Sequence, residues 1–360
     1  MSSSSIKDTK KINPLFNTDF GGIGNNPDNA LFDMLSQSST NNNTHHLKSK
    51  CGCASCRAME ASNNNANMAL ASAGPGSNID PNRVQQLATA IKSNNIEELT
   101  KFDYLRSSFE KNSPQKLQQL DDITKQILED PNFEIKHAGG DFKLDNDTDV
   151  KGLVQNMENG SKPIPEGIRW LVASGIARNF INNPQALDTF KKTNVTFFVA
   201  KNDNKDGTIG LYLSPEELEA KKHVVTVDEN ALLEQFVQKP DLQGGQGQNI
   251  GVGFHEFQHL LDGLDGKVDG FQIGWSQAKK DQWKGIVNNL VLKRYNNPEA
   301  FPRNFGYALS SNNREALAGL DELFNVDSIS LKKFAPEAYA FIAADKGYDP
   351  AQATLQTANA

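Results

Sequence analysis

The sequence predicts an α+β chain in which a polar leader precedes a helical region and a mixed domain of helices and strands. Residues 1 to about 78 are rich in Ser, Asn, Gly and Ala, so they bury too little apolar surface to offset the entropy of ordering. Beyond them, apolar residues recur at helical spacing, and β-branched runs join the helices from about residue 163. We therefore expect a disordered leader over 1–78, a mainly helical region over 79–160, an α+β domain over 161–350 and a flexible tail over 351–360.

Composition narrows the classes of partner and compartment. The chain has 360 residues and a net charge of −7, and no stripe of Lys and Arg is visible, so we expect no nucleic-acid partner. There is no run of 18 apolar residues, so we expect no membrane span. Met1 to Thr18 lack the apolar segment of a signal peptide, which predicts a cytoplasmic protein or one exported by a route other than Sec. Composition says nothing about the oligomeric state.

The helical region is predicted to contain three helices and a short hairpin. Asp80-Pro81 supplies an N-cap and a first-turn proline for the first helix. Helices over 96–109 and 113–128 follow from the spacing of their apolar residues. Short apolar segments at 133–135 and 141–144 predict the hairpin. This region is a candidate prodomain or regulatory arm.

The α+β domain begins with a helix opened by Pro165-Glu166, and two strands follow it. Strand composition is clear at 195–199 and at 223–228. The turn over 202–207 resembles part of a calcium loop, but Leu213 stands where the last carboxylate is needed. We therefore predict a β-hairpin with an Asp-Gly turn at this point. The second strand is either a sheet edge to which an extended peptide adds, or an ordinary core strand.

The stretch with the most specific chemistry is His255-Glu256-Phe-Gln-His259, which lies in an apolar run that favours a helix. Four residues advance a helix by slightly more than one turn, so both histidines project from one face at a separation that suits one metal ion. Glu256 lies at the edge of that face, where its carboxylate can reach a metal-bound water. This arrangement is typical of zinc metallopeptidases. The alternative is a helix whose histidines only line the core.

Two histidines do not complete a catalytic zinc site, which has three protein ligands. Asp265 lies ten residues after His255, the spacing of the third metzincin ligand, but Asp262 replaces the glycine that this pattern needs, which favours a turn. Glu315 and Glu322 lie seven residues apart on a predicted amphipathic helix and face the same way. One could bind the metal while the other accepts a hydrogen bond from a ligand imidazole. The alternative is a pair of solvated acids.

The segment from His255 to Gly270 resembles the MtfA-type zinc peptidases, relatives of the anthrax lethal factor catalytic domain. Their motif is close to H-E-F-A-H-x-L-D-x-x-x-G-x-x-D-G. Their later helix, E-F-F-A-x-x-x-E-x-F-F, is similar to E-A-L-A-G-L-D-E-L-F here, with both glutamates in register. The resemblance covers about residues 224–350 and implies a zincin-like fold. It also implies that one catalytic Zn²⁺ is bound by His255, His259 and Glu315, and that Glu256 is the general base.

The resemblance further implies that Tyr307 stabilises the tetrahedral intermediate of peptide hydrolysis. The sequence departs from the family pattern at two points. Ala316-Leu317 replaces the aromatic pair that follows the ligand glutamate in the family. Tyr307 also lies eight residues before Glu315, one more than the family spacing.

The leader carries its own candidate metal ligands. Cys51, Cys53 and Cys56 follow His45 and His46 closely. These side chains could bind a second zinc, or one thiolate could bind the catalytic zinc and keep the protein inactive. Free thiols are the alternative, and the spacing C-x-C-x-x-C without a fourth cysteine favours it.

Taken together, the sequence predicts a zinc-dependent endopeptidase in which Glu256 activates a zinc-bound water to cleave a peptide or protein substrate. One alternative is a zinc-binding interaction module that cuts nothing. Another is a metzincin-like peptidase that uses Asp265 as its third ligand. A latent enzyme, covered by its leader or helical arm, is a further hypothesis. The identity of the substrate is not predicted.

Overall fold

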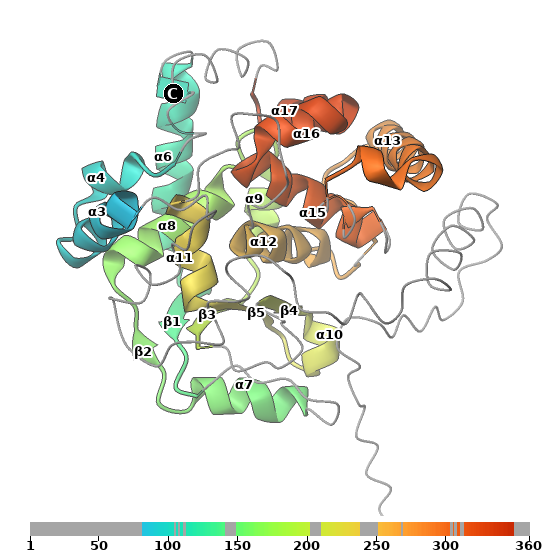
Figure 1. The fold of residues 1–360 in the computed structure, drawn as a ribbon. Helices are drawn as coiled ribbons and strands as arrows, with labels where there is room; N and C mark the ends of the chain where they lie inside the picture. Colours follow the sequence, from blue (N-terminus) through green and yellow to red (C-terminus); the bar gives the residue numbers. More distant parts are fainter. Residues whose placement is uncertain are drawn as a thin grey trace, which may run out of the picture.

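The computed structural model (Figure 1) describes most of the chain after residue 80. The described residues are 81–103, 113–140, 149–201, 210–237, 251–267, 269–302 and 313–348, with positions 106, 109, 110, 305, 308 and 309 between them. Several predicted features lie outside these residues: the leader over 1–78 with Cys51, Cys53 and Cys56, the segment 141–144, the turn over 202–207, Tyr307 and the tail over 351–360.

One five-stranded sheet forms the centre of the fold, with strand order β2-β1-β3-β5-β4. The strands are β1 (Phe133–His137), β2 (Lys162–Pro163), β3 (Val195–Ala200), β4 (Gly210–Leu213) and β5 (His223–Asp228). The three central strands run parallel, while β2 and β4 pair antiparallel at the two edges. Together with the surrounding helices this sheet confirms the α+β class.

The predicted strands at 133–135, 195–199 and 223–228 are present, but one expectation about strand pairing was wrong. The strand before the 202–207 turn, β3, does not pair with the strand after it, β4, because β5 lies between them. A local Asp-Gly signal had favoured the hairpin over this long-range arrangement. For the same reason β5 is an internal strand, and the edge strand next to it is β4. The predicted hairpin over 133–144 is not tested, because its second segment, 141–144, lies outside the described residues. Strand β1 itself pairs with β2 and β3.

Both faces of the sheet are buried, which is usual where parallel strands are covered by helices. Phe197 and Val199 of β3 face the larger hydrophobic core, while Phe198 between them faces a smaller one. The smaller core is closed by α7 (Val150–Glu158) and α10 (Pro215–Leu218), which lie below the sheet in Figure 1. The alternation follows from the two-residue period of a strand.

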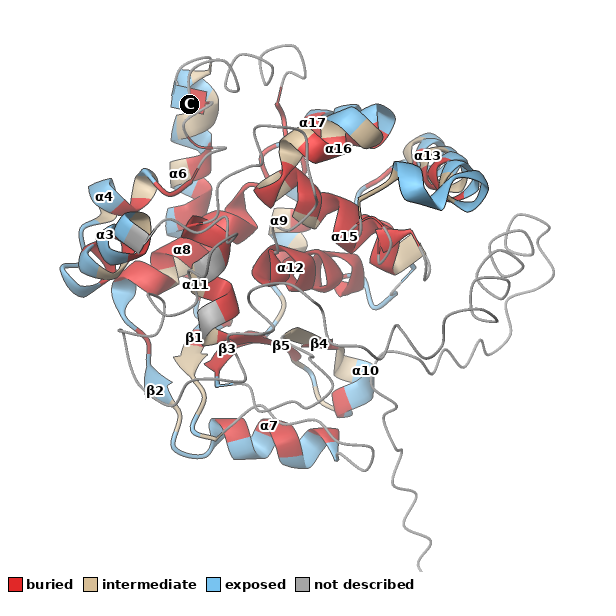
Figure 2. Ribbon diagram, viewed as in Figure 1, coloured by how far each residue is buried: buried red, intermediate tan, exposed pale blue. Residues whose placement is uncertain are grey.

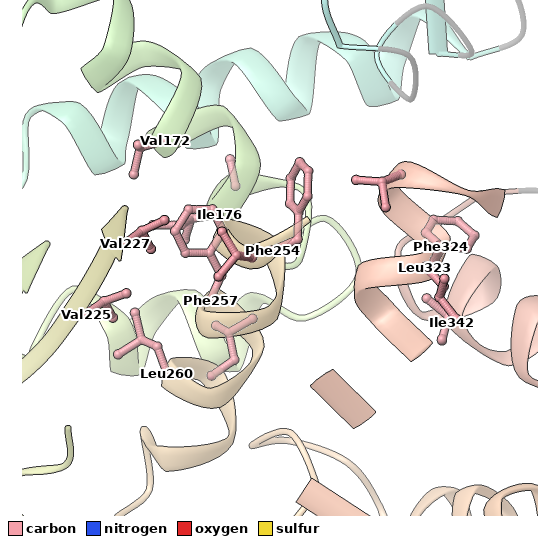
Figure 3. Packing of buried hydrophobic residues seen from close by; sticks show 14 of the residues in the cluster. Val172, Ile176, Val225, Val227, Phe254, Phe257, Leu260, Leu323, Phe324 and Ile342 are labelled. Carbon is pink, nitrogen blue, oxygen red and sulfur yellow. The ribbon is translucent and has the colours of Figure 1, made fainter. Parts of the chain in front are cut away.

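The opposite face is covered by α8 (Glu166–Ala177), α11 (Glu229–Val237) and α12 (Val252–Gly263). Figure 3 shows Phe254 and Phe257 of α12 packed among Ile176 of α8 and Val227 of β5. The ring of Phe257 lies 5.4 Å from that of Phe197 in the sheet. Every residue of α12 is buried, as the uniform colour of this helix in Figure 2 shows. The sheet and two neighbouring helices therefore fix the position of the helix that carries the His-Glu-x-x-His motif.

The remaining helices surround this layer. Along the chain, the helices that precede the first strand are α3 (Pro81–Lys92), α4 (Ile96–Thr100) and α6 (Pro114–Leu128). Helix α9 (Pro184–Phe190) comes just before β3. After α12 come α13 (Gln277–Asn296), the short 3₁₀ helix η1 (Pro298–Ala300), α15 (Asn313–Val326), α16 (Ser328–Phe334) and α17 (Pro336–Asp345). No helix within the described ranges is long and apolar enough to span a membrane.

The N-terminal helices share one hydrophobic core with the later domain. Leu99 of α4 and Ile127 of α6 belong to the same cluster as Phe257 of α12. The predicted helix over 96–109 was wrong in extent, because α4 ends at Thr100 and the Asp103 carboxylate then accepts the backbone N–H of Arg106. The domain boundary at residue 160 stays a prediction, although β1, which precedes it, is a central strand.

A buried ion pair fastens this N-terminal region to α8. Arg178 Nη2 lies 3.0 Å from Asp103 Oδ2, and both side chains are only 3% exposed. Ser174 Oγ donates to the same oxygen at 3.3 Å, and Arg178 Nη1 donates to Asn325 Oδ1 at 2.9 Å. These contacts connect the segment after α4, the C-terminal end of α8 and α15 through buried and partly buried polar groups.

Replacing Asp103 with alanine is expected to lower the free energy of unfolding by about 3–5 kcal/mol, because it leaves the buried guanidinium of Arg178 without its carboxylate. Urea unfolding followed by circular dichroism measures the change. Lys125→Ala is the control, since the Lys125–Glu129 pair is mostly exposed and should contribute less than about 1 kcal/mol. Equal changes in the two variants would contradict the role of the buried pair.

Candidate metal centre

The two motif histidines lie side by side on α12, as their four-residue spacing predicts. Both are buried, and their Nε2 atoms are 3.1 Å apart. Their rings stand nearly perpendicular, at 84° with centroids 4.7 Å apart. This arrangement directs two nitrogen lone pairs at one point rather than stacking the imidazoles.

Glu315 brings the third side chain from the first turn of α15, sixty residues after His255. Its Oε2 is 3.2 Å from His255 Nε2, and its Oε1 is 3.4 Å from His259 Nε2. A tetrahedral zinc ion with bonds of about 2.0–2.1 Å separates its ligand atoms by roughly 3.3 Å. The observed spacings match this value, so the three side chains fit a metal ion of that size. Among the described residues, these three form the group of His, Cys, Asp and Glu side chains that could hold a metal.

Asp265 lies away from this group. It is exposed in the turn that follows α12, and its Oδ1 accepts the backbone N–H of Lys267 at 3.0 Å. Helix α12 continues through Gly263, so the chain does not turn back early enough to bring Asp265 to the histidines. The local geometry is that of a turn residue.

Glu322 lies two turns after Glu315 on α15 and holds His255 from the other side. Its Oε2 is 3.1 Å from His255 Nδ1, and its Oε1 accepts the backbone N–H of Gly251 at 2.7 Å. The second contact reaches the residue just before α12, a helix start that has no side-chain cap of its own. Glu322 therefore orients the imidazole and also ties α15 to the beginning of α12.

The charges in this cluster are strongly coupled. Burial alone would lower the pKa of His255, but the adjacent carboxylates of Glu315 and Glu322 outweigh it and hold that pKa well above the usual value. Burial would raise the pKa of Glu315, but the two imidazoles lower it far below the usual range. Burial lowers the pKa of His259 to about 4. The two carboxylates therefore favour the protonated form of His255 over that of His259.

Glu256 is held in a different environment. Its side chain is buried next to the histidines, and burial raises its pKa to about 7. The edge strand β4 lies beside it, and a Cβ built on Gly210 would come within 2.7 Å of Glu256 Oε1. A carboxylate whose pKa is close to neutral can both accept and return a proton at physiological pH.

Sequence reasoning missed Gly210, because only the fold brings β4 beside α12. Replacing Gly210 with alanine is expected to reduce catalysis about 10- to 100-fold, since the new methyl group must displace Glu256 by a fraction of an ångström to an ångström. Initial rates of peptide cleavage, with metal content measured in parallel, test this. Gly285→Ala on α13 is the control, because its added Cβ meets nothing within 4 Å. A fully active Gly210→Ala protein would contradict the close packing at Glu256.

Arg314 is a second residue that the sequence did not indicate. Its Nε donates to His259 Nδ1 at 3.2 Å, and its guanidinium lies 5.8 Å from the ring centre of Tyr212. A neutral imidazole that binds a metal through Nε2 carries its proton on Nδ1 and cannot accept a hydrogen bond there. The Arg314 contact and metal binding through Nε2 of His259 therefore exclude each other.

The geometry agrees with a comparison against known families. Residues 223–344 match the family model of the glucose-regulated metallo-peptidase M90. The resemblance to the MtfA-type peptidases is confirmed over this segment. The α+β architecture found here is consistent with the zincin-like domain that this resemblance implies. Neither a curated protein nor a solved structure matches the chain significantly.

Proposed function

We propose that this protein is a zinc-dependent endopeptidase. The observation that carries the proposal is the spacing of 3.1–3.4 Å among the ligand atoms of His255, His259 and Glu315, with the buried carboxylate of Glu256 beside them. The M90 match supports metallopeptidase chemistry over the same segment. Two imidazoles and one carboxylate form the donor set of many hydrolytic zinc sites.

His255 and His259 would hold the metal through Nε2, and Glu315 through its carboxylate. A bound Zn²⁺ supplies a Lewis acid that polarises the scissile carbonyl and makes water acidic near neutral pH. Glu322 keeps the proton of His255 on Nδ1 and so leaves Nε2 free to bind. When His255 is doubly protonated, its second proton lies on Nε2, so a metal would compete with that proton and displace it, while the Nδ1 proton stays.

Glu256 performs the proton transfers of the proposed reaction. Burial raises its pKa above the usual range of a carboxylate, which favours uptake of the proton of the attacking water and its later return to the leaving amine. It does not need to bind the metal to do so. Tyr307 remains a proposed stabiliser of the oxyanion, as the resemblance implies.

The substrate is proposed to bind along β4. This strand is the last one in the described sheet, and Gly210 places its backbone next to Glu256. An extended peptide that adds to a sheet edge is held by main-chain hydrogen bonds, which require neither a free amino nor a free carboxyl terminus. This mode of binding favours cleavage within a chain over removal of terminal residues.

Cleavage of denatured casein tests the proposal. Protein stripped with a zinc chelator should be inactive, and stoichiometric Zn²⁺ should restore cleavage in the wild type but not in Glu256→Gln. The same assay on a protein that begins at residue 79 tests whether the leader suppresses activity. If both forms bind zinc stoichiometrically and neither cleaves, the peptidase proposal is wrong and a zinc-binding interaction module takes its place.

A further inference from the structure

Asp262 lies in the last turn of α12, three residues after His259, and its side chain is 1% exposed. One of its oxygens, Oδ1, accepts three consecutive backbone N–H groups, from Asp269 at 3.2 Å, Gly270 at 2.9 Å and Phe271 at 3.1 Å. A single carboxylate oxygen therefore fixes the backbone of residues 269–271, where the loop after α12 comes back to the end of that helix.

The same loop presses against the helix that carries Glu315. A Cβ built on Gly270 would lie 2.6 Å from the carbonyl carbon of Asn313 and 2.7 Å from the backbone nitrogen of Arg314. Gly270 also has a φ of +82°, a conformation that suits glycine. The loop backbone thus packs directly on the backbone of the first turn of α15, one residue before Glu315.

We infer that Asp262 is a positioning residue that sets Glu315 against His255 and His259. Its carboxylate fixes residues 269–271, and Gly270 in turn fixes the start of α15. This inference rests on the proposed role of Glu315 as a metal ligand. It adds a second brace between the two ligand-bearing helices, opposite the one that Glu322 makes to Gly251 at the beginning of α12.

The choice of side chain supports a positioning role. Asp262 Oδ2 is buried and has no hydrogen-bond partner among the described residues, so only one oxygen of the group is used. Asparagine retains that acceptor, with an amide in place of Oδ2. Alanine leaves the N–H groups of Asp269, Gly270 and Phe271 without their acceptor, and each one that stays buried and unpaired costs about 1–3 kcal/mol. The loop is then expected to move, and the start of α15 with it.

Metal affinity tests the inference without relying on activity. Competition between each protein and a chromogenic chelator for Zn²⁺ gives the affinity. Asp262→Ala should bind zinc about 10- to 100-fold more weakly than the wild type, the range found when support of a metal ligand is lost. Asp262→Asn should stay within about threefold, because the acceptor oxygen remains. Asp265→Ala, an exposed change on the same loop, is the matched control and should have no effect.

A double variant that carries both Glu315→Ala and Asp262→Ala shows whether Asp262 acts by positioning Glu315 or whether its loss damages α12 in general. If Asp262 acts through Glu315, adding Asp262→Ala to Glu315→Ala should weaken zinc binding no further. The visible spectrum of the Co²⁺-loaded Asp262→Ala protein should likewise shift toward that of Glu315→Ala. If Asp262→Ala does not fold, Gly270→Ala tests the brace from the other side, because its Cβ would push against Asn313.

Two different failures can be told apart. If Glu315→Ala weakens zinc binding and Asp262→Ala does not, or weakens it equally in both backgrounds, the positioning role is overturned and the proposed metal site stands. If Glu315→Ala leaves zinc affinity unchanged, the proposed ligand set is wrong and the inference falls with it. A loss in Asp262→Asn as large as in Asp262→Ala would also overturn the inference, since the acceptor is then not the cause.

Discussion

A Glu256→Gln protein should keep its metal and lose proteolytic activity by a factor of about 10²–10⁴, the usual contribution of a general acid–base group. Glutamine fills the same buried volume beside Gly210, so the packing of α12 on β4 is preserved. Its amide cannot take a proton from water near neutral pH. The side chain is not among the three whose atoms converge on the metal position, so zinc affinity should be unchanged.

The measurement is the initial rate of casein cleavage, with zinc content determined on the same samples. Gln258→Met is the matched control, because Gln258 is an equally buried polar residue on α12 with no hydrogen-bond partner for its side chain among the described residues. The control should retain metal and most of its activity. Full activity in Glu256→Gln would contradict the general-base role. Loss of zinc in that variant would show that Glu256 is needed to assemble the site.

Local spacing explains why half of the site could be predicted. The positions of His255, Glu256 and His259 follow from helical geometry once the apolar run is recognised. The seven-residue interval between Glu315 and Glu322 likewise predicts that both face the same way. The structure adds that they divide the two contacts on His255, with Glu315 at Nε2 and Glu322 at Nδ1. Which carboxylate takes which nitrogen depends on how α15 packs on α12.

The parts that sequence reasoning missed depend on contacts between distant segments. Strand order cannot be read from strand propensity, so β5 was not expected to separate β3 from β4. Gly210 and Arg314 come next to the site only because β4 and α15 pack against α12. The break after Thr100 has a similar origin, because Asp103 is held by Arg178, the residue that follows α8. In each case a tertiary contact decides between conformations that the local sequence allows.

The identity of the third metal ligand can be tested directly, because Glu315 and Asp265 are the two candidates. Glu315→Ala should weaken zinc binding more than about 100-fold, because it leaves only two of the three protein ligands. Removing a ligand costs more metal affinity than removing a residue that only supports a ligand. Asp265→Ala should bind zinc like the wild type, since the Asp265 carboxylate is exposed and accepts a hydrogen bond from the backbone N–H of Lys267. Chelator competition measures both affinities under the same conditions, and urea unfolding of the metal-free proteins controls for loss of fold.

The opposite outcome has a definite structural consequence. If Asp265→Ala lost zinc while Glu315→Ala kept it, α12 would have to end before Gly263 so that the chain could turn back toward His259. The three hydrogen bonds from residues 269–271 to Asp262 depend on that last helical turn, and they would be lost. A metzincin-like site therefore requires a different end of α12, and the two single variants decide between the two geometries.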